Sequence, residues 1–112
     1  MEMQLSDVGD IRKITLTGRM DSDGVEVIET RFSAALVPVG KSAVVDLSGV
    51  PFLASLGIRM FISTTRALSW KGAKLAIYGA TPAVMEIIES MGMGDVVAVT
   101  TSESEAIALV SA

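Results

Sequence analysis

The sequence predicts one α/β domain in which strands and helices alternate along all 112 residues. Short apolar segments typical of buried strands are separated by longer segments whose apolar residues recur at helical spacing. The first two strands, however, follow each other with only turn residues between them. The expected order is strand-strand-helix-strand-helix-strand-helix-strand-helix, which implies a mixed, mostly parallel sheet that opens with an antiparallel N-terminal hairpin.

The hairpin is predicted from two strands at residues 1–5 and 11–17. In the second strand Ile14 and Leu16 alternate with polar or charged residues, so both should face the core. The intervening residues 6–10 have the composition of a turn.

Helical spacing and terminal signals place the remaining elements. After a loop at residues 18–24, helices are expected at 25–37, 55–70, 81–91 and 101–110, and strands at 42–47, 74–78 and 96–99. Thr81 should cap the third helix, with Pro82 in its first turn. Ser102 and Glu105 have the spacing of a capping box at the last helix.

Composition excludes several classes of protein. The net charge is −4 and the nine basic residues are scattered, which argues against nucleic-acid binding. The chain has no Cys and no His, so it lacks a disulfide, the commonest zinc ligand and a Ser-His-Asp triad. We expect no metal and no cofactor, since even the acidic loop 21–24 lacks the further oxygen ligands of a calcium loop.

We also expect a cytoplasmic protein with no membrane segment. The N-terminus has no apolar signal region, and no apolar run approaches the roughly 20 residues that span a bilayer. The absence of Cys is compatible with a reducing compartment.

The most informative segment is VVDLSGVPFLASLGIRM, residues 44–60. It has the pattern of a buried strand, a turn and the start of a helix, with Ser55 at the expected N-cap and Gly57 just inside. The free N–H groups and the dipole of a first helical turn favour negative charge. A hydroxyl at this place is therefore well sited to accept a phosphate.

Three segments together resemble the STAS domain, and within it the bacterial anti-sigma factor antagonists. They are ITLTGRMD near the N-terminus, VVDLSGVPFLASLGIRMF in the middle and KGAKLAIYGATPAVMEIIESMGM after it. The resemblance covers almost the entire chain and implies a single STAS domain over residues 1–112. It also implies helices packed largely on one face of the sheet, with the mouth of the Ser55 helix exposed beside the loop 18–24.

The resemblance assigns a role to individual positions. Ser55 falls on the serine that the family phosphorylates, and Gly57 falls on the family's glycine. Two positions depart from the usual pattern: Ala54 replaces an Asp, and Leu56 replaces a second hydroxyl residue. Asp21 matches a position where the family often has an acidic residue near the partner surface.

The implied function is partner switching rather than catalysis. The unmodified domain would bind an anti-sigma factor that is itself a serine kinase, phosphorylation of Ser55 would release it, and a serine phosphatase would reset the cycle. The expected partner surface also includes Arg59 and Ser63, with Arg66 at its edge.

Other interpretations remain open at this point. Ser55 could serve only as a helix cap, since Ser is a common N-cap residue. The Ala54 departure also allows a scaffold or sensor STAS domain that binds protein partners or a small ligand without being phosphorylated. An enzyme is disfavoured because the segment 54–57 lacks the first glycine of a nucleophile elbow and no His could activate the serine. A nucleotide site is disfavoured because no glycine-rich phosphate loop with Lys is present.

Overall fold

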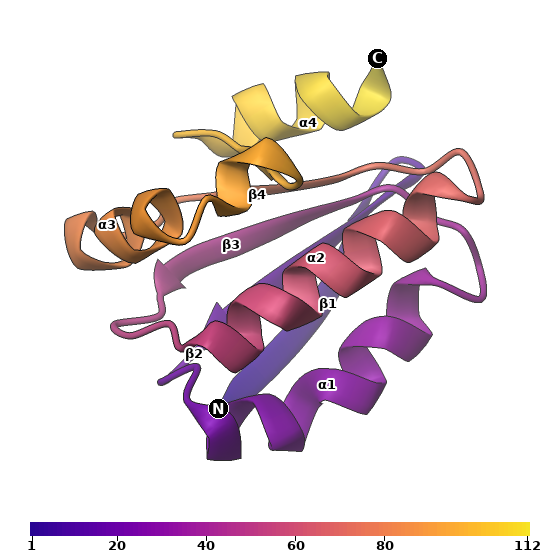
Figure 1. Cartoon of the computed structure of the whole chain (residues 1–112). Helices are drawn as coiled ribbons and strands as arrows, with labels where there is room; N and C mark the ends of the chain where they lie inside the picture. The colour runs from indigo at the N-terminus through magenta and orange to yellow at the C-terminus, as the bar shows by residue number, and fades with distance from the viewer.

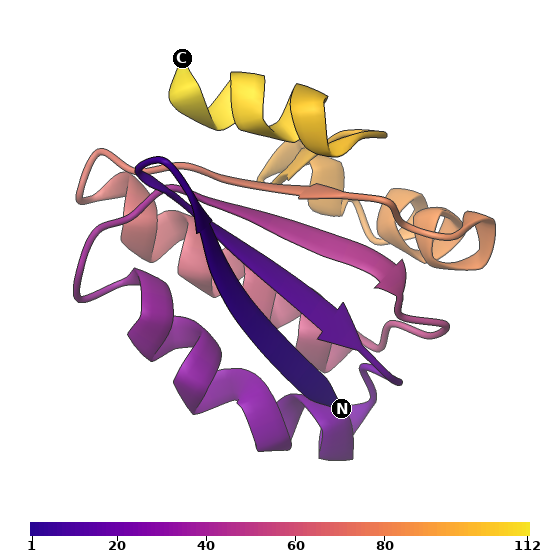
Figure 2. The same ribbon diagram turned by 180° about the vertical axis from the view of Figure 1, so that it is seen from behind.

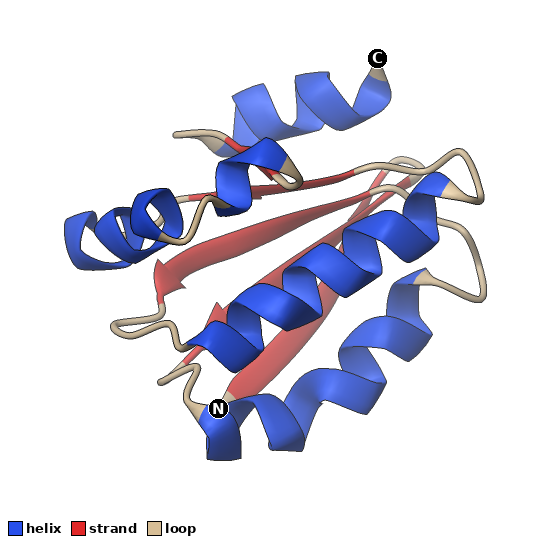
Figure 3. Ribbon diagram, in the orientation of Figure 1, coloured by secondary structure: helices blue, strands red, loops and turns tan.

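The computed structural model describes residues 1–112 and contains one five-stranded sheet in the order β1-β2-β3-β4-β5 (Figures 1 and 3). The strands are β1 (Glu2–Val8), β2 (Ile11–Thr17), β3 (Ala43–Gly49), β4 (Leu75–Tyr78) and β5 (Ala98–Val99). The helices are α1 (Ser22–Leu36), α2 (Ser55–Ser69), α3 (Pro82–Ser90), the short 3₁₀ helix η1 (Met93–Asp95) and α4 (Glu103–Ser111). Only the β1–β2 pair is antiparallel. The predicted mixed sheet with an N-terminal hairpin is confirmed.

The hairpin is longer than predicted. Its register pairs Val8 with Ile11, so the turn consists of Gly9 and Asp10 alone, and Gly9 adopts a positive φ of 61°. The polar residues before the turn are compatible with pairing because β1 is an edge strand with exposed side chains. Asp7 itself forms ion pairs with two cations outside its own strand.

Helices α1 and α2 lie side by side on one face of the sheet (Figure 1). Phe32 of α1 and Phe61 of α2 contact edge to face, with ring centroids 5.7 Å apart. Ile14 and Leu16 of β2 are fully buried in the same core, which confirms the predicted inner face of that strand. This core lies between the sheet and the two helices that position the site.

Helix α4 lies on the opposite face, across β3 and β4. Its Ala106 and Val110 form a second, smaller apolar cluster with Val44 and Ala76 of the sheet. Figure 2 shows no helix over β1 on this face, and α4 reaches only as far as β2, where Lys13 pairs with Glu103. The residues Val84 and Ile88 of α3 join the main core, so the helices are packed largely on one face, with α4 as the exception.

Two helix caps agree with the sequence, whereas the start of α1 does not. Thr81 and Ser102 both accept a backbone N–H in the first turn of the helix that follows them. Helix α1 begins at Ser22 rather than at residue 25, because the Asp21 carboxylate accepts a hydrogen bond from the Gly24 N–H (2.8 Å). No helix is both long and apolar enough to cross a membrane.

Candidate functional site

The loop between β2 and α1 is joined to the segment that precedes α2. Met20 and Leu53 form a parallel bridge outside the main strands. The Met20 N–H donates to the Phe52 carbonyl (2.9 Å), and the Ala54 N–H donates to the Met20 carbonyl (2.9 Å). The structure therefore brings the loop 18–24 and the N-terminus of α2 together into one surface.

Gly57 permits this close approach. A Cβ atom at this position would lie 2.7 Å from Leu53 Cδ1 and 3.0 Å from Met20 Cε, so a larger residue would require the ends of these two side chains to shift. Gly57 is buried, which means that its contribution to the site is to packing beneath the surface.

Ser55 is the first residue of α2 and not its N-cap, which corrects the expected position by one residue. The N-cap is Ala54, with extended backbone (φ −90°, ψ 166°) and no side-chain cap. The N–H groups of Gly57 and Ile58 donate to the Ala54 carbonyl, which starts the helix. The bridge at Leu53 decides where the helix begins, although Ser55 has the better capping side chain.

The Ser55 hydroxyl is free for other chemistry. The residue is exposed, and its Oγ forms no hydrogen bond within the protein. The backbone N–H groups of Ser55 and Leu56 also donate to no protein acceptor, as expected for the first turn of a helix. Unpaired N–H groups and an exposed hydroxyl therefore lie at the same helix end.

The neighbouring predicted residues have unequal exposure. Ala54 and Leu56 are half-buried, and Leu56 packs against the main core. Asp21 is half-buried too, and its carboxylate is engaged both by Gly24 and by the Arg19 guanidinium (3.6 Å). The acidic group is thus held in place beside the loop rather than free in solvent.

Sequence reasoning missed an aromatic–cation contact beside this site. The Arg19 guanidinium lies 4.5 Å from the centre of the Phe52 ring. Arg19 is exposed and Phe52 is half-buried. Their positions, 33 residues apart, carry no signal in the sequence because the contact depends on the bridge between the two loops.

The outer face of α2 is cationic. Ser55, Arg59, Ser63 and Arg66 are all exposed and recur at helical spacing along the helix. Neither arginine forms an ion pair, and α2 contains no Asp or Glu. We call these four residues the α2 stripe.

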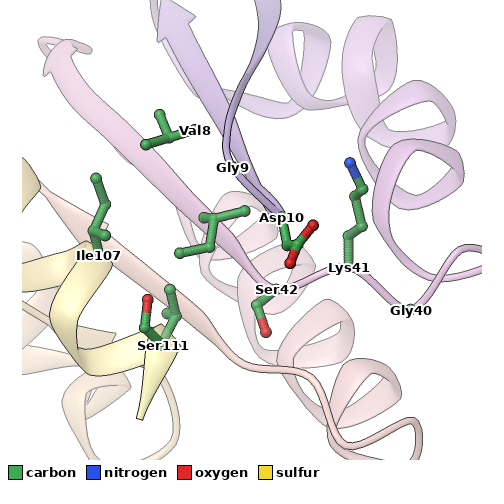
Figure 4. A pocket seen from close by; sticks show the side chains of 10 residues that line it. Val8, Gly9, Asp10, Gly40, Lys41, Ser42, Ile107 and Ser111 are labelled. Atoms are coloured by element: carbon green, nitrogen blue, oxygen red, sulfur yellow. The ribbon is translucent and has the colours of Figure 1, made fainter.

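The largest hollow in the protein lies elsewhere. It has a volume of about 700 Å³ and is bounded by the β1–β2 turn, residues 40–42 and α4. Figure 4 shows Ile107 and Ser111 of α4 on one side of it and Gly40 and Lys41 on the other. Since residues 40–42 precede β3 and Ser55 follows it, this hollow and Ser55 lie at opposite ends of the sheet. No predicted site residue lines it, and no group of three or more Asp, Glu, His or Cys side chains anywhere could hold a metal ion.

Comparisons with known proteins agree with this arrangement. The family model described as Mlab, STAS domain, matches residues 3–100. No curated protein sequence matches the chain. The structure resembles an anti-sigma factor antagonist from Mycobacterium paratuberculosis with a TM-score of 0.88 and 20% identity, over 99% of this chain and 94% of that one.

Two further solved structures show the same fold. The anti-sigma factor antagonist SpoIIAA in its unphosphorylated form matches with a TM-score of 0.78 and 23% identity, over 98% of this chain and 96% of that one. The Bacillus cell fate determinant SpoIIAA in its phosphorylated form matches with a TM-score of 0.70 and 22% identity, over 97% of this chain and 99% of that one. Because the family model covers most of the chain and the fold agrees over nearly its full length, the protein belongs to the STAS domain family.

Proposed function

We propose that this STAS domain is an anti-sigma factor antagonist that acts by partner switching, with Ser55 as the phosphoacceptor. The observation that supports it best is the free Ser55 hydroxyl, which is exposed at the first turn of α2 and has no internal hydrogen bond to lose. A kinase can reach such a group without unfolding the domain. The chain contains no His that could act as a general base for Ser55, which supports a regulatory rather than a catalytic role for this serine.

The isolated domain should tolerate a phosphate at this position. A phosphoserine adds about −1.5 to −2 charges. The unpaired N–H groups of Ser55 and Leu56 and the helix dipole favour that charge. Arg59 lies one turn away with no ion-pair partner of its own and can pair with the phosphate. Modification is therefore expected to leave the fold intact.

The same phosphate should disrupt a complex. The α2 stripe offers two arginines and no acid, so a partner that covers it should present acidic groups. A phosphate among those groups is repelled and must lose water, which costs several kcal/mol when no cation compensates. Because each 1.4 kcal/mol changes affinity about tenfold, a cost of about 4 kcal/mol weakens binding by roughly three orders of magnitude.

The proposed partners are an anti-sigma factor with serine kinase activity and a serine phosphatase that resets the cycle. The proposed contact residues are Asp21 in the loop, Ala54 and Leu56 at the N-terminus of α2, and Arg59 and Ser63 on the α2 stripe. The buried Gly57 supports this surface from beneath. An ATP-dependent cycle of this kind also places the protein in the cytoplasm.

The residues on either side of Ser55, at the N-terminus of α2, support a second function. Ala54 and Leu56 present no acidic or hydroxyl side chain beside Ser55, where the family pattern has both. A scaffold or sensor STAS domain would bind a protein partner or a small ligand through the same surface without modification of Ser55. The two functions predict different effects of a negative charge at residue 55 on the affinity for the partner.

The deciding experiment captures the partner from the native cell extract on immobilised wild-type domain and then compares variants. Ser55→Asp should lose at least a hundredfold in affinity for the captured partner. Ser104→Asp is the matched control, because Ser104 is an exposed serine in the first turn of α4 and lies outside the proposed surface. Incubation of the captured partner with ATP should then add one phosphoryl group to the wild-type domain, located on Ser55 by peptide mass spectrometry.

Each readout separates the two functions. Unchanged binding of Ser55→Asp and no phosphoryl gain would exclude the switch and leave the scaffold. Loss of binding with both Ser55→Asp and Ser104→Asp would show that any added charge weakens the complex, which contradicts a role for this particular hydroxyl.

A further inference from the structure

Charge is distributed unevenly between the two parts of the chain. Residues 75–112 contain five acidic residues and no Lys or Arg, whereas residues 1–74 have a net charge of +1. The acidic part forms β4, α3, η1, β5 and α4, coloured orange to yellow in Figure 1, and these elements lie together at one side of the molecule. Unbalanced acidic charge is therefore concentrated in one part of the molecule, and the rest is close to neutral.

The acidic side contains an open hollow at the edge of the sheet. It has a volume of about 460 Å³ and lies between α3, η1 and the end of β5. Met85, Ile88 and Val99 contribute apolar surface to it, and Glu89 and Asp95 line it with carboxylates. Both acidic residues are exposed, and neither forms an ion pair within the chain. β5 is an edge strand, so no further strand covers this side.

An exposed aromatic side chain and two cations lie at the C-terminal end of α2. Trp70 is the C-cap residue of that helix and is 90% exposed, which is exceptional for the largest apolar side chain in the protein. Arg66 precedes it by one helical turn and Lys71 follows it directly. Both cations are exposed and have no acidic partner. An exposed aromatic side chain flanked by two cations thus projects from the part of the chain that has no excess of acidic charge.

We propose that two copies of this chain associate head to tail, with Trp70 of one copy entering the hollow between α3 and β5 of the next. The indole would cover the apolar surface of Met85, Ile88 and Val99. Arg66 and Lys71 would lie against the carboxylates of Glu89 and Asp95. Tryptophan and arginine are the side chains most enriched at the centres of protein interfaces, and the complementary charges favour this orientation over like-with-like contact.

The geometry of such a contact has two consequences. It joins different surfaces of the two copies, so each added copy leaves one free Trp70 and one free hollow, and the assembly can extend into a ring or a chain. Ser55 and Trp70 are at opposite ends of α2, about 22 Å apart along its axis at 1.5 Å per residue. The Trp70 half of the contact is therefore remote from Ser55 of the same copy, and we expect Ser55→Asp to associate like the wild type. This separates a failure of the head-to-tail contact from a failure of the proposed switch.

Sedimentation velocity of the purified chain over a range of concentrations tests the contact. The wild type should associate reversibly, and the association should weaken when ionic strength is raised from about 0.05 M to about 0.5 M, because exposed charges are then screened. Trp70→Ala and Glu89→Arg should each raise the dissociation constant at least tenfold. Glu26→Arg, the same reversal on the exposed outer side of α1, is the matched control and should associate like the wild type.

Mixing the two defective variants gives the sharpest result. Trp70→Ala keeps the acidic hollow and Glu89→Arg keeps the indole, so the mixture has one intact contact and should form a one-to-one complex that grows no further. A wild-type chain that stays monomeric up to about 1 mM contradicts the inference. Association that survives in Trp70→Ala, or a mixture that stays monomeric while the wild type associates, contradicts it as well. Because Trp70 and Glu89 are both exposed, unchanged circular dichroism melts would show that the variants are folded.

Discussion

Met20 is bonded through its N–H and its carbonyl to the two residues on either side of Leu53. This pairing links a loop that follows β2 to the segment that follows β3, and it places both against the first turn of α2. The exposed hydroxyl of Ser55 and the guanidinium of Arg19 are positioned by this one contact. The geometry of the site therefore depends on the packing of the loop against α2. Substitution of a glycine in that packing should disturb it most.

Gly24→Ala is expected to destabilise the domain. A Cβ atom on Gly24 would collide with the backbone carbonyl oxygen of Arg19, which cannot move without displacing the loop. Alanine gains about 1 kcal/mol of helix propensity over glycine, but overpacking of this kind costs typically 1–3 kcal/mol and backbone contacts lie at the upper end. We expect a net loss of about 1–2 kcal/mol in the free energy of unfolding, measured by urea titration. Gly94→Ala, where a Cβ would meet nothing within 4 Å, should lose nothing, and equal losses in both variants would contradict the role of the loop.

Ser55→Asp is expected to stabilise the isolated domain slightly. The first turn of α2 contains no acidic residue, and the N–H groups of Ser55 and Leu56 are unpaired. A carboxylate there interacts favourably with the helix dipole, by about 0.3–1 kcal/mol at low ionic strength. Thermal unfolding monitored by circular dichroism should show a higher midpoint at neutral pH than at a pH where the new carboxyl is protonated.

A double-mutant cycle tests whether Arg59 interacts with charge at Ser55. The two residues are four positions apart on one helix, so a carboxylate at residue 55 and the guanidinium should couple by about 0.2–0.5 kcal/mol. Arg59→Ala alone should change stability little, because Arg59 forms no ion pair in the unmodified chain. Arg66→Ala serves as the control, since it lies three turns away, and a coupling of the same size there would show a general charge effect instead of a specific pair.

Tyr78→Phe should leave stability unchanged or improve it. The Tyr78 hydroxyl oxygen is buried beside the Lys13 ammonium, but it makes no hydrogen bond of good geometry, and Lys13 pairs instead with Glu103 (3.0 Å). Burial raises the pKa of the Tyr78 hydroxyl, in keeping with a poorly solvated group. Removing an unsatisfied polar atom can be neutral or favourable by up to about 1 kcal/mol. Urea unfolding at neutral pH measures the change, and a loss of more than about 1 kcal/mol would mean that the hydroxyl makes an interaction in solution.

The pKa of Asp7 should rise when Arg12, its partner across the hairpin, is removed. The hydrogen bond from Arg12 (3.2 Å) lowers the pKa of the Asp7 carboxyl below its ordinary value, and Lys41 adds to the effect. A carboxyl with a depressed folded-state pKa contributes stability above its unfolded-state pKa, and that stability is lost as pH falls through the folded-state value. NMR titration of the side-chain carboxyl should show Asp7 titrating below the ordinary range of an aspartate, and Arg12→Gln should raise the Asp7 value. Identical titration of Asp7 before and after that substitution would contradict the pair.

Local pattern was enough to predict most elements of this fold. The alternation of Ile14 and Leu16 identified a strand with one buried face, and the signals at Thr81 and Ser102 identified two helix starts, because side chain and backbone interact there within one turn. The same local reasoning placed the hairpin turn too early and ended β1 at residue 5, because polar residues at an edge strand look like a turn when their pairing partner is not considered.

The sequence by itself determined the order of elements, the family resemblance and the presence of a serine at the start of α2. Only the tertiary structure decided that Ala54 caps that helix and that Ser55 is left without a hydrogen bond, because the start of α2 is set by pairing between Met20 and Leu53. It also decided that Arg19 lies over Phe52 and that Trp70 is left in solvent. These facts depend on contacts between residues far apart in the chain, and the free energy of such contacts comes from packing and geometry that no local pattern of residues records.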